Sequence, residues 1–161
     1  MRLPILEKLE KELMESEREL KVDIPQALRV ATAMGDLSEN ADYKAAKERQ
    51  MFLESRISLL QKRVADITAL NIKRIPTDRS ALGSTLVLKE VESGESRVYK
   101  LVFPEEVDPE KGKISPGSPV GKTLLGKRPG DQVTISMSDN TRVYEVAQLT
   151  TIHEELGQDP D

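Results

Sequence analysis

The chain has 161 residues, of which 37% are hydrophobic, 32% charged and only 3% aromatic, and so little apolar bulk favours an elongated protein with at least one small compact part over one large core. It contains no cysteine, which excludes disulfides and thiolate metal sites, and its net charge of −4 argues against strong binding to free nucleic acid. No apolar run approaches the roughly 20 residues of a membrane span and the first residues do not resemble a signal peptide, so we expect a cytoplasmic protein without membrane contact.

The first half of the chain is typical of helix, beginning with residues 3–34. Apolar side chains recur there at alternating steps of three and four residues, which is the a/d pattern of a coiled coil. These seam positions are Leu6, Leu9, Leu13, Leu20, Ala27, Val30 and Met34, with Ser16 and Asp23 as polar interruptions. Pro25 would delete a helical hydrogen bond, so we expect a kink near Val22–Pro25 rather than the end of the helix.

A second seam follows in residues 43–67. Its positions are Tyr43, Ala46, Gln50, Leu53, Ile57, Leu60, Val64 and Ile67. The link between the two seams is so short that the helices must be antiparallel neighbours. In that link, Gly35 suits the left-handed position that ends a helix, and Asp36 or Ser38 can cap the next one. We therefore predict an antiparallel coiled-coil hairpin of about 45 Å over residues 1–76, with an acidic tip at residues 35–40.

After residue 78 the hydrophobic pattern changes to a period of two, which predicts a small β-sheet domain with one short helix over residues 80–153. The predicted strands are Ser84–Val91, Arg97–Phe103, Gln132–Met137 and Thr141–Thr151, and the predicted helix is Pro119–Leu125, between Ser118 and Gly126. Residues 104–118 read as a long loop, and the acidic residues 154–161 as a disordered tail. His153, the only histidine, is expected on the surface. The fold class is therefore α+β with two domains.

Two acidic side chains, Asp36 and Glu39, stand three residues apart between the predicted helices. That spacing is typical of a capping box, in which both would bind backbone N–H groups at the start of the second helix. Carboxylate oxygens are also the ligands that Mg²⁺ prefers, although two of them on an exposed turn are too few to hold it tightly. Completed by a second protein and an RNA phosphate, the pair could hold the metal and orient a water. The spacing is compatible with both interpretations.

Further motifs occur in both halves of the chain. The first is the run Gly35-Asp36-Leu37-Ser38-Glu39-Asn40-Ala41-Asp42-Tyr43, followed by Ala45-Ala46-Lys47 and Gln50. The second set comprises Gly83-Ser84-Thr85, Asp108-Pro109-Glu110-Lys111-Gly112-Lys113-Ile114-Ser115, Ser118-Pro119 and Leu124-Leu125-Gly126-Lys127. Together they resemble the bacterial transcript-cleavage factors of the GreA/GreB family over nearly the whole chain.

The resemblance implies a function in transcription elongation and an FKBP-like fold for the C-terminal domain. In that family the coiled coil enters the secondary channel of RNA polymerase, and tip carboxylates help to hold the second Mg²⁺ and a water beside the 3′ end of the backtracked nascent RNA. The polymerase then cleaves its own transcript. The matching carboxylates here are Asp36 and Glu39. The protein would have no catalytic activity of its own, would bind no metal or cofactor stably, and would act as a monomer.

The resemblance also assigns supporting roles. The residues that would shape the tip are Gly35, Leu37, Ser38, Asn40 and Tyr43. Candidates to steer the RNA backbone are Arg29, Lys44, Lys47 and Arg49, which could equally be solvated charges of the coiled coil. Ser118 and Pro119 fall in the segment that would dock on the polymerase.

Other functions remain as alternatives. A regulator that occupies the channel without stimulating cleavage would share the architecture but alter the tip, and a structural adaptor would leave the tip motif without a reason. Prolyl isomerase activity needs an aromatic-lined pocket, for which the C-terminal domain offers only Tyr99, Phe103 and Tyr144.

Overall fold

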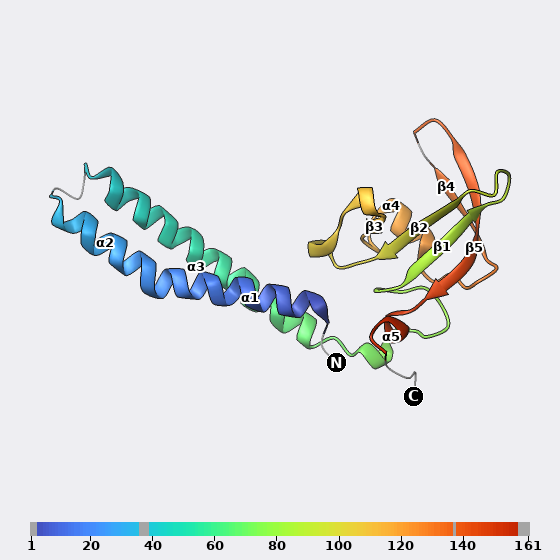
Figure 1. Ribbon diagram of the computed structural model, residues 1–161, viewed down its shortest axis with the longest axis horizontal. Coiled ribbons are helices and arrows are strands. Elements are labelled where there is room, and N and C mark those ends of the chain that lie inside the picture. The colour runs from blue at the N-terminus through green and yellow to red at the C-terminus, as the bar shows by residue number, and fades with distance from the viewer. Residues whose placement is uncertain (1–2, 36–38, 137, 158–161) are drawn as a thin grey trace. The chain divides into compact units, whose positions relative to one another are not determined.

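The computed structural model describes residues 3–35, 39–136 and 138–157. The chain divides into two compact units, Arg2–Leu70 and Asn71–Asp161. The first is helical, and the second is built on a curled β-sheet (Figure 1). The predicted α+β fold class is confirmed.

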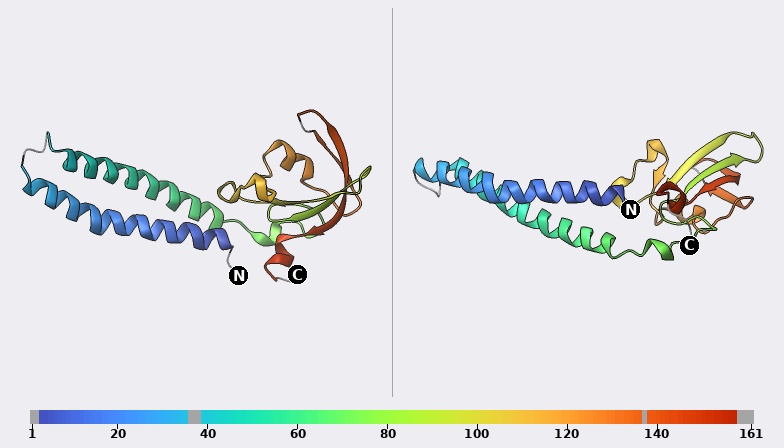
Figure 2. Two further views of the ribbon diagram at one scale, coloured as in Figure 1. Left: turned by 45° about the horizontal axis from the view of Figure 1, so that its top comes forward. Right: turned by 60° about the horizontal axis from the view of Figure 1, so that its bottom comes forward.

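The first unit is an antiparallel helical hairpin, whose two arms lie side by side in both views of Figure 2. The outgoing arm comprises α1 (Pro4–Arg18), a π-helical turn (Glu19–Asp23) and α2 (Ile24–Ala33). The return arm is the single helix α3 (Ala41–Thr68), about 42 Å long at 1.5 Å per residue.

The return arm follows the predicted seam along its whole length. All eight seam side chains are at least half-buried: Ala46, Leu53, Ile57, Leu60 and Ile67 are buried, and Tyr43, Gln50 and Val64 are half-buried. The three- and four-residue spacing alone therefore located the packed face of α3.

The outgoing arm follows its predicted seam only as far as the π-helical turn. Beyond the turn the predicted positions Ala27, Val30 and Met34 are exposed. The side chains that face the partner helix there are one residue further along the chain than the heptad pattern predicts: Ile24 and Ala31 are buried, and Leu28 is half-buried. The prediction of one continuous seam is wrong for this part of the arm.

The cause lies in the hydrogen bonding before Pro25. The N–H of Ile24 donates to the carbonyl oxygen of Glu19, five residues earlier, so this turn contains one residue more than an α-helical turn. A proline inside a regular α-helix clashes with the carbonyl four residues before it, and the wider turn relieves that clash. The extra residue moves the seam forward by one position, which buries Ile24 and leaves the carboxylate of Asp23 exposed.

The second unit is a five-stranded sheet with the strand order β3-β2-β1-β5-β4. Its strands are β1 (Thr85–Glu90), β2 (Ser96–Leu101), β3 (Lys113–Ile114), β4 (Gln132–Ser136) and β5 (Thr141–Thr150). Neighbouring strands are antiparallel except for the parallel pair β2 and β3. The core side chains are Leu86, Leu88, Leu101, Leu124, Val133, Ile135, Tyr144 and Val146.

Shorter helices complete this unit. They are η2 (Ile72–Arg74), η3 (Pro104–Glu106), η4 (Pro109–Lys111), α4 (Pro119–Leu124) and α5 (Ile152–Glu155). The four predicted strands and α4 lie where the alternation and the caps indicated. The prediction missed the two-residue strand β3, which lies inside the predicted loop 104–118. Two residues are too few to show a period.

The end of the described chain differs from the prediction. His153 is buried, and its Nε2 atom lies 2.7 Å from the carbonyl oxygen of Ile75. The neighbouring Ile152 is also buried, at the place where a Cβ on Gly83 would collide with it. This packing orders α5, so the predictions of a surface His153 and of disorder from residue 154 are wrong; residues 158–161 lie outside the described part. Across the described residues, no helix is long and apolar enough to span a membrane.

Candidate functional site at the hairpin tip

The tip joins α2 to α3, and the structure describes it at Gly35, Glu39 and Asn40. Three predicted tip residues, Asp36, Leu37 and Ser38, lie outside the described residues. Gly35 has φ +122°, a backbone conformation that other residues rarely adopt, whereas a Cβ there would meet no atom within 4 Å. Glycine is therefore needed here for its backbone conformation and not because a side chain would collide with a neighbour.

Asn40 starts the return arm. Its backbone has non-helical angles (φ −82°, ψ 106°), and its side-chain Oδ1 accepts a hydrogen bond from the N–H of Tyr43 at 3.1 Å, so Asn40 is the N-cap of α3. Glu39 therefore precedes the cap instead of lying in the first helical turn. The predicted capping box of Asp36 and Glu39 is wrong, as is the prediction that Asp36 or Ser38 caps this helix.

The amide of Asn40 also contacts the other arm. Its Nδ2 donates to the carbonyl oxygen of Ala31, in the last turn of α2, at 2.7 Å. Ala31 is a seam residue and is 1% exposed. One side chain thus holds the end of one helix against the start of the other.

Glu39, directly before the Asn40 clamp (the bond from the Asn40 side chain to the carbonyl of Ala31), is exposed. An exposed carboxylate can accept hydrogen bonds from a water or contribute an oxygen ligand to a hard cation. Among the described residues there is no group of three or more His, Cys, Asp or Glu side chains that could hold a metal ion. What the described tip can do chemically is present the Glu39 carboxylate as a hydrogen-bond acceptor or as an oxygen ligand.

Of the four predicted RNA-steering residues, Arg49 is bound within the hairpin. Its guanidinium contacts both carboxylate oxygens of Glu19, at 2.6 and 2.9 Å, and lies 5.0 Å from the ring centroid of Phe52. The hydrogen bond from Arg49 lowers the pKa of the Glu19 carboxyl and raises that of the guanidinium. Because Glu19 begins the π-helical turn, this ion pair attaches the turn to the return arm.

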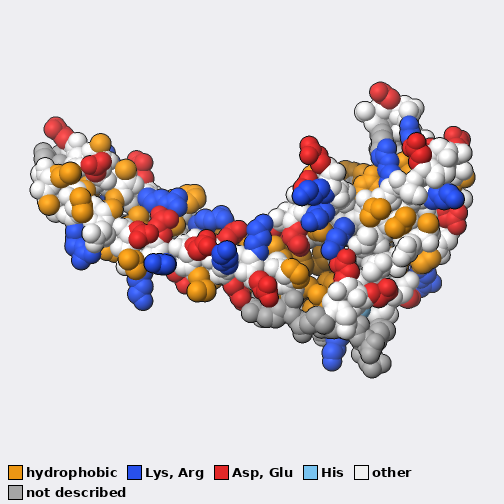
Figure 3. Space-filling model, viewed as in Figure 1, with side chains coloured by type: hydrophobic (Ala, Val, Ile, Leu, Met, Phe, Trp, Pro, Cys, Tyr) orange, Lys and Arg blue, Asp and Glu red, His pale blue; other side chains and the backbone are white. Residues whose placement is uncertain are grey.

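The other three cationic candidates lie nearer to the tip. Lys47 lies 5.8 Å from the ring centroid of Tyr43, Arg29 bonds to the side chain of Gln26 at 3.2 Å, and Lys44 is exposed. Acidic and basic side chains alternate along the face of the arm seen in Figure 3. A steering role for these cations stays a prediction.

Ser118 and Pro119 begin α4 in the sheet unit. The hydroxyl of Ser118 accepts from the N–H of Gly121 at 3.1 Å and donates to the carbonyl of Ser115 at 2.7 Å, while Pro119 is exposed in the first turn. The predicted cap and first-turn proline are both present. These contacts give Ser118 a local structural role, and its docking role stays a prediction.

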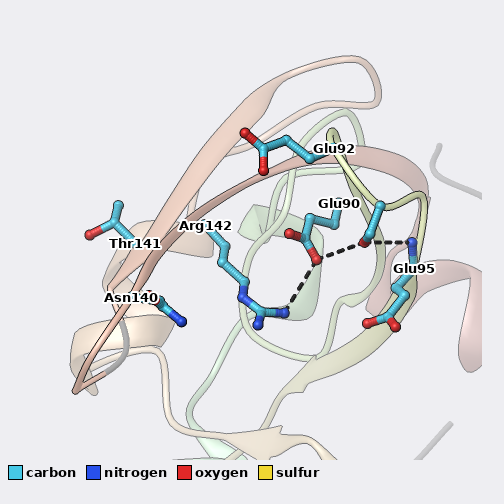
Figure 4. Close-up of a pocket in the computed structure, with 7 residues that line it drawn as sticks. Glu90, Glu92, Glu95, Asn140, Thr141 and Arg142 are labelled. Carbon is cyan, nitrogen blue, oxygen red and sulfur yellow. Dashed lines mark hydrogen bonds and ion pairs between the residues drawn. The ribbon is translucent and has the colours of Figure 1, made fainter.

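Sequence reasoning missed a polar cluster where the β1–β2 turn meets the start of β5, beside a surface pocket of about 420 Å³ (Figure 4). Glu90, on β1, accepts a hydrogen bond from Ser93 at 2.8 Å and pairs with Arg142 of β5 at 3.4 Å. The alternation along β1 places Glu90 on the buried face of the strand. A carboxylate at a buried position needs a charged or hydrogen-bonding partner, so the sequence could have indicated such a pair. The cluster holds the β1–β2 turn to β5.

Comparison with known proteins covers both units. The family described as "Transcription elongation factor, N-terminal" matches residues 5–68, and that described as "Transcription elongation factor, GreA/GreB, C-term" matches residues 75–151. The transcription elongation factor GreA of Nitratidesulfovibrio vulgaris is 39% identical over 141 residues, which cover 88% of this chain and 86% of the relative. That of Chloroherpeton thalassium is 42% identical over 142 residues, covering 88% and 90%.

The chain belongs to the GreA/GreB family. It is a transcription elongation factor, as the tip and C-terminal motifs predicted, and these relatives do not favour the alternative of a regulator without cleavage activity. A solved prokaryotic GreA/GreB factor from Nitrosomonas europaea has 27% identity and a TM-score of 0.44, with 60% of this chain and 79% of that chain covered. In this GreA/GreB chain, the hairpin tip lies inside the first family match, and Ser118 and Pro119 lie inside the second.

Proposed function

We propose that this elongation factor inserts its hairpin into the secondary channel of RNA polymerase and stimulates the polymerase to cleave backtracked nascent RNA. The observation that carries the proposal is the exposed Glu39 carboxylate at the narrow end of a two-helix arm, directly before the Asn40 clamp. A rigid arm of this kind can deliver a carboxylate into a site that a globular domain could not enter.

In this proposal Asp36 and Glu39 complete a shared magnesium site. The donor set fits, because hard cations prefer carboxylate oxygens and Mg²⁺ is commonly held by one or two of them together with waters and phosphates. When bound, the ion would polarise the scissile phosphate and acidify a water. The role of this chain is to place its carboxylates, accept hydrogen bonds from the water and orient it toward the phosphorus. The factor binds no cofactor stably by itself and has no independent catalysis.

Other parts of the chain would support entry and binding. Lys44, Lys47 and Arg29 lie toward the tip and would attract the RNA backbone at the 3′ end, whereas Arg49 is occupied by Glu19. Ser118 and Pro119, at the start of α4, would contact the polymerase near the channel. The factor would act as a monomer in the cytoplasm, where transcription takes place in bacteria.

The test uses stalled, backtracked polymerase complexes mixed with the full chain. Wild type should shorten the transcript, and Asp36→Ala and Glu39→Ala should each lose this activity while still competing with wild type for the polymerase. Glu48→Ala, which removes an exposed carboxylate from α3 away from the tip, is the matched control and should cleave like wild type. Equal shortening by the tip variants and wild type would contradict the proposed mechanism.

A further inference from the structure

We propose that Asn40 is a positioning residue for the Glu39 carboxylate: its amide joins the two arms and so fixes the direction in which Glu39 projects. This inference rests on the proposed function and adds a residue that acts through Glu39. Asn40 itself, half-buried between the helix ends, need not touch the RNA or the metal.

The side chain of Asn40 uses both of its polar atoms. Nδ2 donates to Ala31 across the tip at 2.7 Å, and Oδ1 accepts from Tyr43 at 3.1 Å. Its backbone carbonyl accepts from the N–H of Lys44 at 3.1 Å, the first bond of the helical ladder. Three bonds from one residue therefore hold it to both arms at once.

Each helix end supplies a group with unused hydrogen-bonding capacity. A helix leaves its last carbonyls without the usual N–H donor four residues later, and its first N–H groups without an intrahelical acceptor. The carbonyl of Ala31 already accepts from Met34 at 3.1 Å, which leaves its second lone pair for Asn40. The clamp thus joins the buried Ala31 to the half-buried Asn40, at a place where water competes little for the bond.

Asparagine suits this position better than the other good cap residues. Aspartate would cap α3 equally well, but its carboxylate has no donor and would face the carbonyl oxygen of Ala31. Serine also caps a helix, but its single short hydroxyl cannot reach both partners. An N-cap alone therefore does not require asparagine, whereas a cap combined with a cross-arm donor does.

The clamp acts on Glu39 through the backbone. Consecutive Cα atoms are fixed about 3.8 Å apart by a planar peptide, so holding Asn40 to both arms restricts where the Glu39 Cα can lie. Catalytic geometry is sensitive at this scale, because a displacement of about 1 Å can cost a reaction about 100-fold in rate. Loss of the clamp should therefore lower the rate of transcript cleavage strongly and change the free energy of unfolding little.

The first test concerns the free protein and does not depend on cleavage. In Asn40→Ser and Asn40→Asp, which keep a capping oxygen, the Tyr43 amide should remain protected from hydrogen exchange, while the order parameter of the Glu39 amide should fall from about 0.85 to below about 0.6. Asn71→Ser makes the same exchange at another capping asparagine, the start of η2, and should leave Glu39 unchanged. A Glu39 amide as rigid in both variants as in wild type would overturn the inference.

The second test measures cleavage at increasing factor concentration. Asn40→Ser should lower the maximal rate by about 10- to 100-fold with an unchanged half-saturating concentration, whereas Asn71→Ser should change neither. A raised half-saturating concentration with an intact maximal rate would show a merely structural role. If wild type itself failed to cleave, the proposed function would fail, and the order parameters would still decide the role of Asn40.

Discussion

The two arms of the hairpin pack against each other along one seam, but they differ in the helical geometry that brings their side chains to it. The return arm, α3, is one uninterrupted helix whose buried side chains all fall on the heptad positions. The outgoing arm contains the π-helical turn, after which every packed side chain lies one position later than the pattern predicts. The outgoing arm carries Pro25, and α3 has no proline.

The difference shows how far a heptad pattern can be extrapolated. A pattern assigns side chains to a face only while the helix keeps the same hydrogen bonding, because each inserted residue rotates everything after it by about 100°. In the outgoing arm a regular helix would place Asp23 on the seam, and the π-helical turn places Ile24 there instead. Burial of an isoleucine in place of a carboxylate favours the irregular helix.

The sharpest way to break the comparison is to delete one exposed residue from each arm. Deleting Ser58 from α3 should rotate Leu60 and Ile67 off the seam and cost more than about 4 kcal/mol, since each buried residue of this size contributes about 2–5. Deleting Val22 from the π-helical turn should restore an ordinary heptad step and cost at most the roughly 3 kcal/mol of the clash at Pro25. Both losses in the free energy of unfolding can be measured by denaturant unfolding of the full chain, monitored by the helical circular dichroism signal. Equal losses would show that the π-helical turn tolerates the deletion of a residue no better than α3 does.

Substitution of a single side chain tests the shifted seam. Ile24→Ala should cost about 2–5 kcal/mol, because Ile24 is 4% exposed. Val22→Ala should change stability by less than about 0.5 kcal/mol, since Val22 is 54% exposed. The comparison uses the same unfolding measurement, and equal losses from the two variants would contradict the packing of Ile24 in the seam.

Replacing Pro25 tests whether the outgoing arm is strained. If the π-helical turn accommodates the ring, Pro25→Ala should change stability by no more than about 1 kcal/mol, and the Ile24 amide should keep its bond to Glu19 in scalar-coupling spectra. A proline in an ordinary helix interior costs about 3 kcal/mol. A stabilisation of that size on replacement would therefore mean that the turn leaves the clash unrelieved.

The smallest effect is expected at the ion pair between the arms. Because Arg49 lowers the pKa of Glu19 below its ordinary value of about 4.3, the pair stabilises the fold above that pH, and this contribution is lost as pH falls through the lowered pKa. Glu19→Gln should lower the melting temperature by less than about 3 °C at pH 7, since exposed pairs contribute little. The deficit should shrink below about pH 4; a constant deficit down to pH 2 would contradict the assignment.

Much of the fold could be predicted from local patterns. Alternation located four strands, and the sequence from Ser118 and Pro119 to Gly126 located α4, because these signals act within a few residues. The site was predicted less well. Asp36-x-x-Glu39 matches a capping box by spacing, but Asn40 competes for the same role and is as good a cap, so only the backbone path decides between them.

Sequence alone determined the α3 seam, the short link, and the carboxylate-bearing tip, since each follows from the spacing of neighbouring residues. Tertiary structure decided what depends on distant partners. It placed His153 against the carbonyl of Ile75, shifted the outgoing seam by one residue, and joined Asn40 to Ala31. Burial and hydrogen-bond satisfaction act on groups far apart in the chain, and no local pattern records which of them will meet.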